Sequence, residues 1–141
     1  MGDHFMRTLI VDDEPIARQV LREELESFSD VQIVGEAEDG KEALQLIDKL
    51  QPDLVFLDLQ LPLICGFDVV RSLRGERLPV IIIVTAFDQH AIELLEAGAI
   101  NYLYLLKPVS EARLSRAVER ARYLRNKPMQ IAQGLARITS A

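Results

Sequence analysis

The chain has 141 residues, with 22 acidic and 16 basic side chains and a formal net charge of −6. This length fits one domain with its own hydrophobic core, and the negative charge argues against a nucleic-acid surface on this segment itself. The single cysteine, Cys65, excludes an internal disulfide framework and fits a reducing cytoplasm, where we expect the protein. The longest apolar runs have the length of strands, so we expect no membrane span.

Five short apolar runs predict β-strands. They lie near residues 9–11, 31–34, 53–58, 80–84 and 101–106. The third run is continuously apolar between two acids, which is typical of a strand that is buried on both faces of a parallel sheet. The fourth run is the richest in β-branched residues, which favours the same environment.

Segments with helical spacing of apolar residues separate these runs. Helix start signals precede three of them at Pro15, Asp39 and Ser110. In the first predicted helix, the expected apolar face consists of Ile16, Val20, Leu21, Leu25 and Phe28. A further helix is expected near residues 67–73, and another near residues 91–97, before Gly98.

The alternation of strands and helices predicts an α/β fold, a doubly wound five-stranded parallel sheet with helices on both faces. We place this domain at residues 6–127. Residues 1–5 are expected to be an N-terminal extension. Residues 128–141 are expected to be either a tail or a linker toward an output domain outside this sequence.

Polar side chains that could bind a metal or take part in a reaction follow four of the predicted strands. Asp12 and Asp13 follow the first strand, Asp58 the third, Thr85 the fourth and Lys107 the fifth. Because the carboxyl ends of parallel strands share one edge of the sheet, these side chains can converge in one crevice. Three crowded carboxylates repel one another, and a hard divalent cation such as Mg²⁺ relieves that repulsion. Each residue alone has an ordinary explanation as a helix-start acid, a strand-end hydroxyl or a surface lysine.

Together these segments resemble the receiver domains of bacterial two-component response regulators. The matching pieces are Leu-Ile-Val-Asp-Asp-Glu-Pro at Asp12, Asp58 with Pro62 and Gly66 behind it, Val-Thr-Ala at Thr85, and Leu-Lys-Pro at Lys107. The resemblance covers nearly all of residues 6–127 and implies a flavodoxin-like fold of the receiver type.

The resemblance implies a phosphoacceptor role for Asp58, with a histidine kinase or a phosphotransfer protein as the partner. It also implies Mg²⁺ as the cofactor, with Asp13, Asp58 and the main-chain carbonyl of Gln60 as ligands and Asp12 acting through water. Mg²⁺ and Lys107 would neutralise the charge that moves onto the phosphoryl oxygens.

The resemblance further implies a conformational switch. The Thr85 hydroxyl would bond a phosphoryl oxygen, and this movement would be coupled to an aromatic side chain on the fifth strand, which its distance from Lys107 assigns to Tyr104. The chain has two more residues before Lys107 than the family pattern Gly-Ala-x-Asp-Tyr-Leu-x-Lys-Pro, so Tyr102 is the alternative. Phosphorylation would then change the surface of the fourth helix, fifth strand and fifth helix, which is the candidate homodimer surface.

We therefore expect a signalling switch rather than a turnover enzyme, controlling transcription through a DNA-binding output domain outside this sequence. The runs Asp-Glu-Pro-Ile-Ala-Arg and Ser-Glu-Ala-Arg-Leu look like those of LytTR-type transcriptional regulators. One alternative is a Mg²⁺-dependent phosphohydrolase with an Asp nucleophile, although Gln60 stands where haloacid-dehalogenase-type phosphatases need a second acid. The other is a receiver-like binding module that is never phosphorylated, against which the intact set of acids argues.

Overall fold

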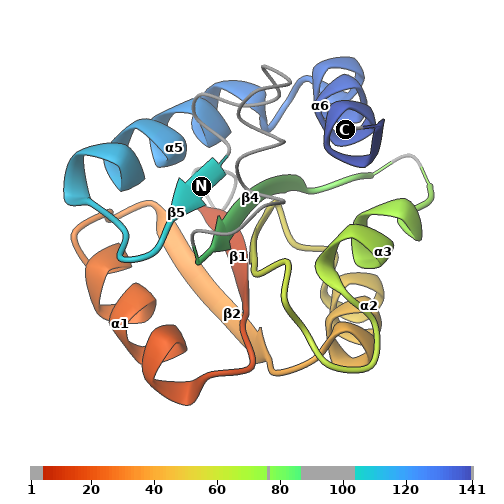
Figure 1. Ribbon diagram of the computed structural model, residues 1–141. Helices are drawn as coiled ribbons and strands as arrows, with labels where there is room; N and C mark the ends of the chain where they lie inside the picture. The colour runs from red at the N-terminus through yellow and green to blue at the C-terminus, as the bar shows by residue number, and fades with distance from the viewer. Residues whose placement is uncertain (1–4, 76, 87–103, 141) are drawn as a thin grey trace.

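The computed structural model describes residues 5–75, 77–86 and 104–140 (Figure 1). Its elements are, in chain order, β1 (Met6–Val11), α1 (Pro15–Leu25), β2 (Val31–Ala37), α2 (Gly40–Leu50), β3 (Leu54–Leu57), α3 (Gly66–Arg71), β4 (Val80–Thr85), β5 (Tyr104–Leu106), α5 (Glu111–Leu124) and α6 (Pro128–Ser140). The helix predicted near residues 91–97 and residues 101–103 of the predicted fifth strand lie outside the described residues. None of the helices described is both long enough and apolar enough to cross a membrane.

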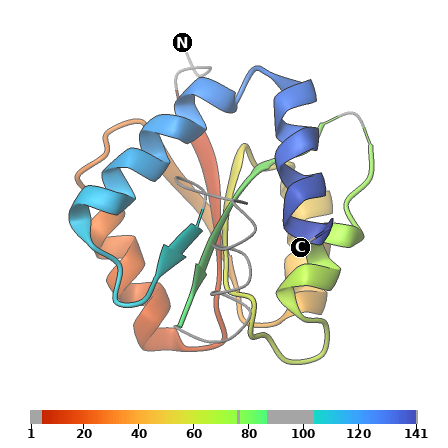
Figure 2. The ribbon, with the colours of Figure 1, turned by 45° about the horizontal axis from the view of Figure 1, so that its top comes forward.

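The five strands form one parallel sheet in the order β2-β1-β3-β4-β5. Helices α1 and α5 cover one face of the sheet, and α2, α3 and α6 cover the other (Figures 1 and 2). The predicted doubly wound α/β fold is thus confirmed. From β1 the chain runs outward to β2 and then returns to β3 on the other side, so the strand order reverses between β1 and β3. In open α/β sheets, this reversal opens a crevice at the carboxyl ends of the two strands.

The two central strands, β3 and β4, are buried along their whole length. Their apolar and largely β-branched side chains face helices on both sides of the sheet, which explains why their sequences are continuous rather than alternating. Most of the core therefore lies directly behind the strand ends that carry the polar residues.

Helix α1 packs on the sheet through a narrower face than its sequence predicts. Leu21 and Leu25 are buried, whereas Ile16 is 79% exposed and Val20 is 48% exposed. At 3.6 residues per turn, Ile16 and Val20 lie about 100° or more around the helix from the two buried leucines. Their assignment to the apolar face was wrong.

Residues 128–140, for which the sequence analysis predicted no element, form helix α6. Pro128 begins the helix, a position where the missing N–H of proline costs nothing. Ile131 and Leu135, four residues apart, are buried on the core beside Leu124. Helix α6 contacts α3 and α5, so the folded unit continues past Lys127 (Figure 2).

Candidate functional site

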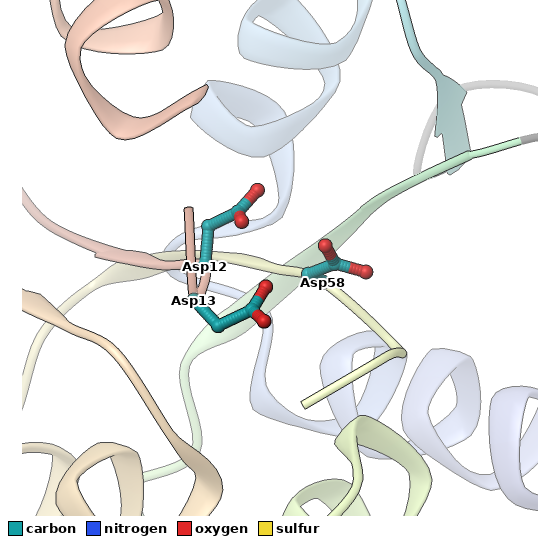
Figure 3. Close-up of side chains that lie close together, drawn as sticks. All are labelled: Asp12, Asp13 and Asp58. Carbon is teal, nitrogen blue, oxygen red and sulfur yellow. The ribbon is translucent and has the colours of Figure 1, made fainter. Parts of the chain in front are cut away.

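Three aspartates meet where the strand order reverses (Figure 3). Asp12 and Asp13 follow β1, and Asp58 follows β3, whose Leu57 pairs with Val11. The main-chain N–H of Asp58 donates to the carbonyl of Val11 over 3.0 Å, which fixes the two strand ends against each other. One carboxylate oxygen from each aspartate lies within 4.8 Å of those of the other two. The structure thus brings together the acids that the sequence places at the ends of two different strands.

The three carboxylates differ in burial and in bonding. Asp12 and Asp58 are 6% and 4% exposed, whereas Asp13 is exposed to solvent. Burial raises the pKa of Asp58 above its ordinary value, although hydrogen bonds from the Gln60 N–H and from Lys107 act in the opposite direction. Burial therefore disfavours the ionised form of the Asp58 carboxylate, and a bound cation would reduce this free-energy cost.

Lys107 follows β5 and reaches across β4 to two of the acids. Its Nζ donates to Asp12 Oδ2 over 2.7 Å and to Asp58 Oδ2 over 3.0 Å. Burial acts to lower the pKa of Lys107, but the hydrogen bonds to Asp12 and Asp58 outweigh this effect and raise its pKa. The side chain is therefore a fixed cation that partly compensates the acidic cluster.

Thr85 ends β4 and closes another side of the site. Its side chain is buried, and its hydroxyl donates to Asp58 Oδ1 over 3.1 Å. The main-chain carbonyl of Thr85 accepts from the N–H of Lys107 over 2.9 Å, which ties the ends of β4 and β5 together. Tyr104, the first residue of β5, pairs with Ile83 of β4 and is 1% exposed. Tyr102, the alternative switch residue, lies outside the described residues.

The loop between β3 and α3 wraps closely around Asp58. The main-chain N–H of Gln60 donates to Asp58 Oδ1 over 3.0 Å, so the Gln60 backbone lies beside the carboxylate. A Cβ at Gly66 would lie 2.6 Å from the carbonyl oxygen of Asp58, and one at Gly40 would lie 1.8 Å from that of Ile64. Both positions require glycine because another segment of backbone occupies the space of a side chain. In the sequence, Gly66 stands out only as part of the family match behind Asp58, and the role of Gly40 is not apparent.

The donor set fits a hard divalent cation. Three carboxylates supply oxygen atoms, the ligands that Mg²⁺ prefers, and the exposed Asp13 leaves one side open for water and a phosphate. Lys107 offsets only part of the charge of the three acids. The cluster therefore carries excess negative charge that a metal ion would neutralise.

A doubly wound sheet with acids, a hydroxyl and a lysine at its switch point defines a class of phosphate-handling α/β domain. Comparison with known families makes the assignment specific. Residues 8–119 match the family described as the response regulator receiver domain, and the chain belongs to this family.

Relatives and solved structures agree with this assignment. The chain is 46% identical over 122 residues to the transcriptional regulatory protein BtsR of Escherichia coli K12, covering 86% of this chain and 50% of that protein. The response regulatory domain of protein mrkE from Klebsiella pneumoniae superposes with a TM-score of 0.73 at 29% identity, over 86% and 99% of the two chains. The receiver domain of RcsB from Salmonella enterica serovar Typhimurium, solved with the phosphomimetic BeF₃⁻, gives 0.72 at 25% identity, over 84% and 89%. The chain spans about half the length of the curated relatives that it matches.

Proposed function

We propose that the chain is the phosphorylation-dependent switch of a two-component system, with Asp58 as the phosphoacceptor. The observation that carries this proposal is the setting of the Asp58 carboxylate. Its Oδ1 accepts from Thr85 and from the Gln60 N–H, its Oδ2 accepts from Lys107, and two further carboxylates lie beside it. A receiver domain similar to this one, that of RcsB, has been solved with a phosphoryl mimic, which supports the same chemistry here.

In the proposed reaction, an Asp58 carboxylate oxygen forms a bond to phosphorus as the bond between phosphorus and the donor breaks. From a phosphohistidine the leaving group is the imidazole nitrogen, and the product on the chain is an acyl phosphate. Lys107 is already within 3.0 Å of Asp58 and would pair with a phosphoryl oxygen after transfer. The Thr85 hydroxyl, which donates to Asp58 Oδ1, would donate to another phosphoryl oxygen.

Mg²⁺ is the metal that the acidic cluster fits. Asp13, Asp58 and the main-chain carbonyl of Gln60 would hold it, and Asp12 would act through water. When bound, the ion supplies charge neutralisation for the phosphoryl oxygens. The chain's own residues orient the carboxylate and partly exclude water from it, since Asp58 is 4% exposed.

The conformational output of the switch would pass through Thr85 and Tyr104, with Tyr102 as the alternative. Thr85 and Tyr104 lie on neighbouring strands, and both side chains are buried. A shift of the Thr85 hydroxyl toward a phosphoryl oxygen would therefore be transmitted to the packing around β5. The candidate surface for a homodimer is formed by β5, α5 and the helix predicted near residues 91–97, which lies outside the described residues.

The proposed partners are a histidine kinase or phosphotransfer protein and an output domain that acts on DNA. BtsR is a transcriptional regulatory protein about twice as long as the segment that this chain matches. We infer a cytoplasmic regulator, a signalling protein rather than a turnover enzyme, whose output domain is of the LytTR type. The acidic charge of the present segment is consistent with DNA contacts being made by that other domain.

Turnover distinguishes the switch from the rival phosphohydrolase. The protein is incubated with Mg²⁺ and an excess of a small acyl phosphate, while released inorganic phosphate and protein mass are followed together. A switch gains one phosphoryl group per chain and releases phosphate slowly. Rapid release of many equivalents, without a phosphorylated species, would favour the phosphohydrolase.

A further inference from the structure

The side chain of Arg18, on α1, contacts the loop after β1 that carries Asp12 and Asp13. Its Nη1 donates to the main-chain carbonyl of Asp12 over 2.6 Å, and its Nε donates to Glu36 Oε1 over 2.9 Å. The side chain is 15% exposed, so this cation is largely removed from solvent. In the sequence, Arg18 appears only as the last residue of the run Asp-Glu-Pro-Ile-Ala-Arg. Its contacts are not apparent there, because Asp12 and Glu36 lie 6 and 18 residues away from it.

Glu36 gives Arg18 a fixed anchor. It lies on β2, where its backbone pairs with Ile10 of β1, and its carboxylate also accepts from Arg22. Burial acts to raise the pKa of Glu36, but the hydrogen bonds from Arg22 and Arg18 outweigh it and lower its pKa. The ionised form of Glu36 is thus stabilised. The guanidinium of Arg18 is held by hydrogen bonds to Glu36 on β2 and to the carbonyl of Asp12 in the loop after β1.

Asp12 and Asp13 are positioned in different ways. Asp12 is held directly, because its N–H donates to Ala37, its Oδ1 accepts from the N–H of Glu14 and its Oδ2 accepts from Lys107. The carboxylate of Asp13 is exposed and has no hydrogen bond or ion pair within the part of the chain that the structure describes. Its direction therefore depends on the backbone, above all on the peptide group that joins Asp12 to Asp13. The oxygen of that peptide group is the one that Arg18 binds.

We propose that Arg18 is a positioning residue for the metal site, which fixes the Asp12–Asp13 peptide group and so preorganises the Asp13 carboxylate for a divalent cation. The inference rests on the proposed function, since it takes the three aspartates as a Mg²⁺ site. Arg18 does not touch the metal in this arrangement. It acts through the backbone, as outer groups around metal ligands do.

The positive charge of Arg18 and its positioning role affect the affinity for Mg²⁺ in opposite directions. A cation near the acids repels Mg²⁺, so removing the charge alone would strengthen metal binding. Removing the support of the peptide group would weaken it, because Asp13 would sample directions that do not face the site. The sign of the change therefore separates the two effects.

Arg22 provides the matched control. It lies one helical turn further along α1 and binds the same carboxylate of Glu36, but its hydrogen bonds within the described residues go to Glu36 rather than to Asp12. Arg18→Met and Arg22→Met each remove one positive charge, and they remove one and two hydrogen bonds to Glu36, respectively. Only Arg18→Met also frees the carbonyl of Asp12.

The test is isothermal titration of the full chain with MgCl₂, because the chain contains no Trp to report binding by fluorescence. Arg18→Met is expected to raise the Kd for Mg²⁺ by about tenfold or more. Arg22→Met is expected to leave it within about twofold of the wild type, and Arg18→Lys to lie between, since one ammonium reaches fewer acceptors than a guanidinium. Saturating Mg²⁺ should restore phosphorylation of Arg18→Met, as expected for a defect in metal binding.

Equal Kd values for Arg18→Met and Arg22→Met, or tighter binding by Arg18→Met, would overturn the inference. Circular dichroism in EDTA checks that each variant is folded. Should Arg18→Met not fold, Glu36→Gln takes its place, because it loosens the anchor and keeps Arg18; an unchanged Kd for this variant would equally overturn the inference. A wild-type chain that does not bind Mg²⁺ would instead contradict the proposed metal site, and this inference with it.

Discussion

The ammonium of Lys107 lies 3.0 Å from Oδ2 of Asp58, although the two residues are 49 positions apart in the chain. This contact spans the ends of β3 and β5, with β4 between them. It places a fixed positive charge beside the carboxylate that we assign as the phosphoacceptor. The same ammonium binds Asp12, so one cation connects acids that follow two different strands.

Replacing Lys107 with Met should lower both stability and phosphorylation. Asp12 and Asp58 would lose their shared cation while remaining buried, which costs about 1–3 kcal/mol of unfolding free energy in EDTA. Urea unfolding measures the change, and Lys41→Met, at an exposed position on α2, is the control. A Lys107→Met variant as stable as this control would contradict the assigned pairing.

Replacing Asp58 with Asn should stabilise the metal-free protein. The substitution removes one of three crowded carboxylates. It also removes a buried negative charge that is unfavourable in the folded protein, since burial raises the pKa of Asp58. In EDTA we expect a rise in Tm of about 4 °C, the shift that about 1 kcal/mol produces in a domain of this size.

With Mg²⁺ present, the wild type should instead have a higher Tm than Asp58→Asn, because ligand binding stabilises only the protein that retains the site. Glu23→Gln, which removes an exposed charge from α1, should change Tm little in either condition. If Asp58→Asn were less stable than the wild type in EDTA, the repulsion among the three acids would not be the dominant effect.

The ion pair between Asp30 and Arg122 should make stability depend on pH. The hydrogen bond from Arg122 lowers the pKa of Asp30 below its ordinary value of 3.8. A carboxyl with a lowered folded-state pKa contributes stability above its unfolded pKa and loses it as the pH falls through the folded value.

The Arg122→Gln variant should therefore have a lower unfolding free energy than the wild type. This deficit should be full near pH 6 and vanish progressively below pH 3.8. The pair is partly exposed, at 42% and 26% of the two side chains, so the deficit should stay below about 1 kcal/mol. Urea unfolding of Arg122→Gln and of Arg116→Gln, an exposed arginine on the same helix, measures it across this range. A deficit that is constant from pH 6 to pH 3 would rule out the pair as its source.

Replacing Gly66 with Ala should disturb the loop behind Asp58. The new Cβ would lie 2.6 Å from the Asp58 carbonyl oxygen and 2.7 Å from the Cα of Leu59, both backbone atoms that cannot rotate away. We expect a loss of about 1–3 kcal/mol in unfolding free energy together with weaker Mg²⁺ binding.

Gly35→Ala serves as the comparison, because its nearest contacts, at 3.2 and 3.4 Å, are the flexible ends of Leu50 and Leu9. This variant should lose less stability and keep its Mg²⁺ affinity. Equal effects of the two substitutions on Mg²⁺ binding would show that the close approach at Gly66 does not shape the site.

The fold and the acidic cluster were predictable because both follow from local patterns joined by one topological rule. Continuous apolar runs indicate buried parallel strands, and parallel strands bring their carboxyl ends to one edge. Asp12, Asp58 and Thr85 each follow such a run directly, so their convergence needs no knowledge of side-chain contacts. Lys107 was predictable on the same basis, although its pairing with Asp12 was not.

Features that depend on contacts between distant segments were not predictable. Arg18 resembles any helix-surface arginine until Glu36 and the Asp12 carbonyl are seen beside it. Gly40 is an ordinary helix-start residue until the backbone of Ile64 is found against it. Helix α6 was missed although Pro128 and the helical spacing of Ile131, Leu135 and Ile138 indicate a helix. That this segment packs on the core depends on partners of Ile131 and Leu135 that lie on other elements.

The most direct measurement is the mass of the intact chain after incubation with a small acyl phosphate and Mg²⁺. We predict the gain of one phosphoryl group, its location at Asp58 by peptide mapping after chemical reduction of the acyl phosphate, and no gain in Asp58→Asn. The phosphorylated fraction should depend on Mg²⁺ and fall to background in EDTA. A wild-type chain that stays unmodified, or one that carries the group at another residue, would contradict the assignment of Asp58 as the phosphoacceptor.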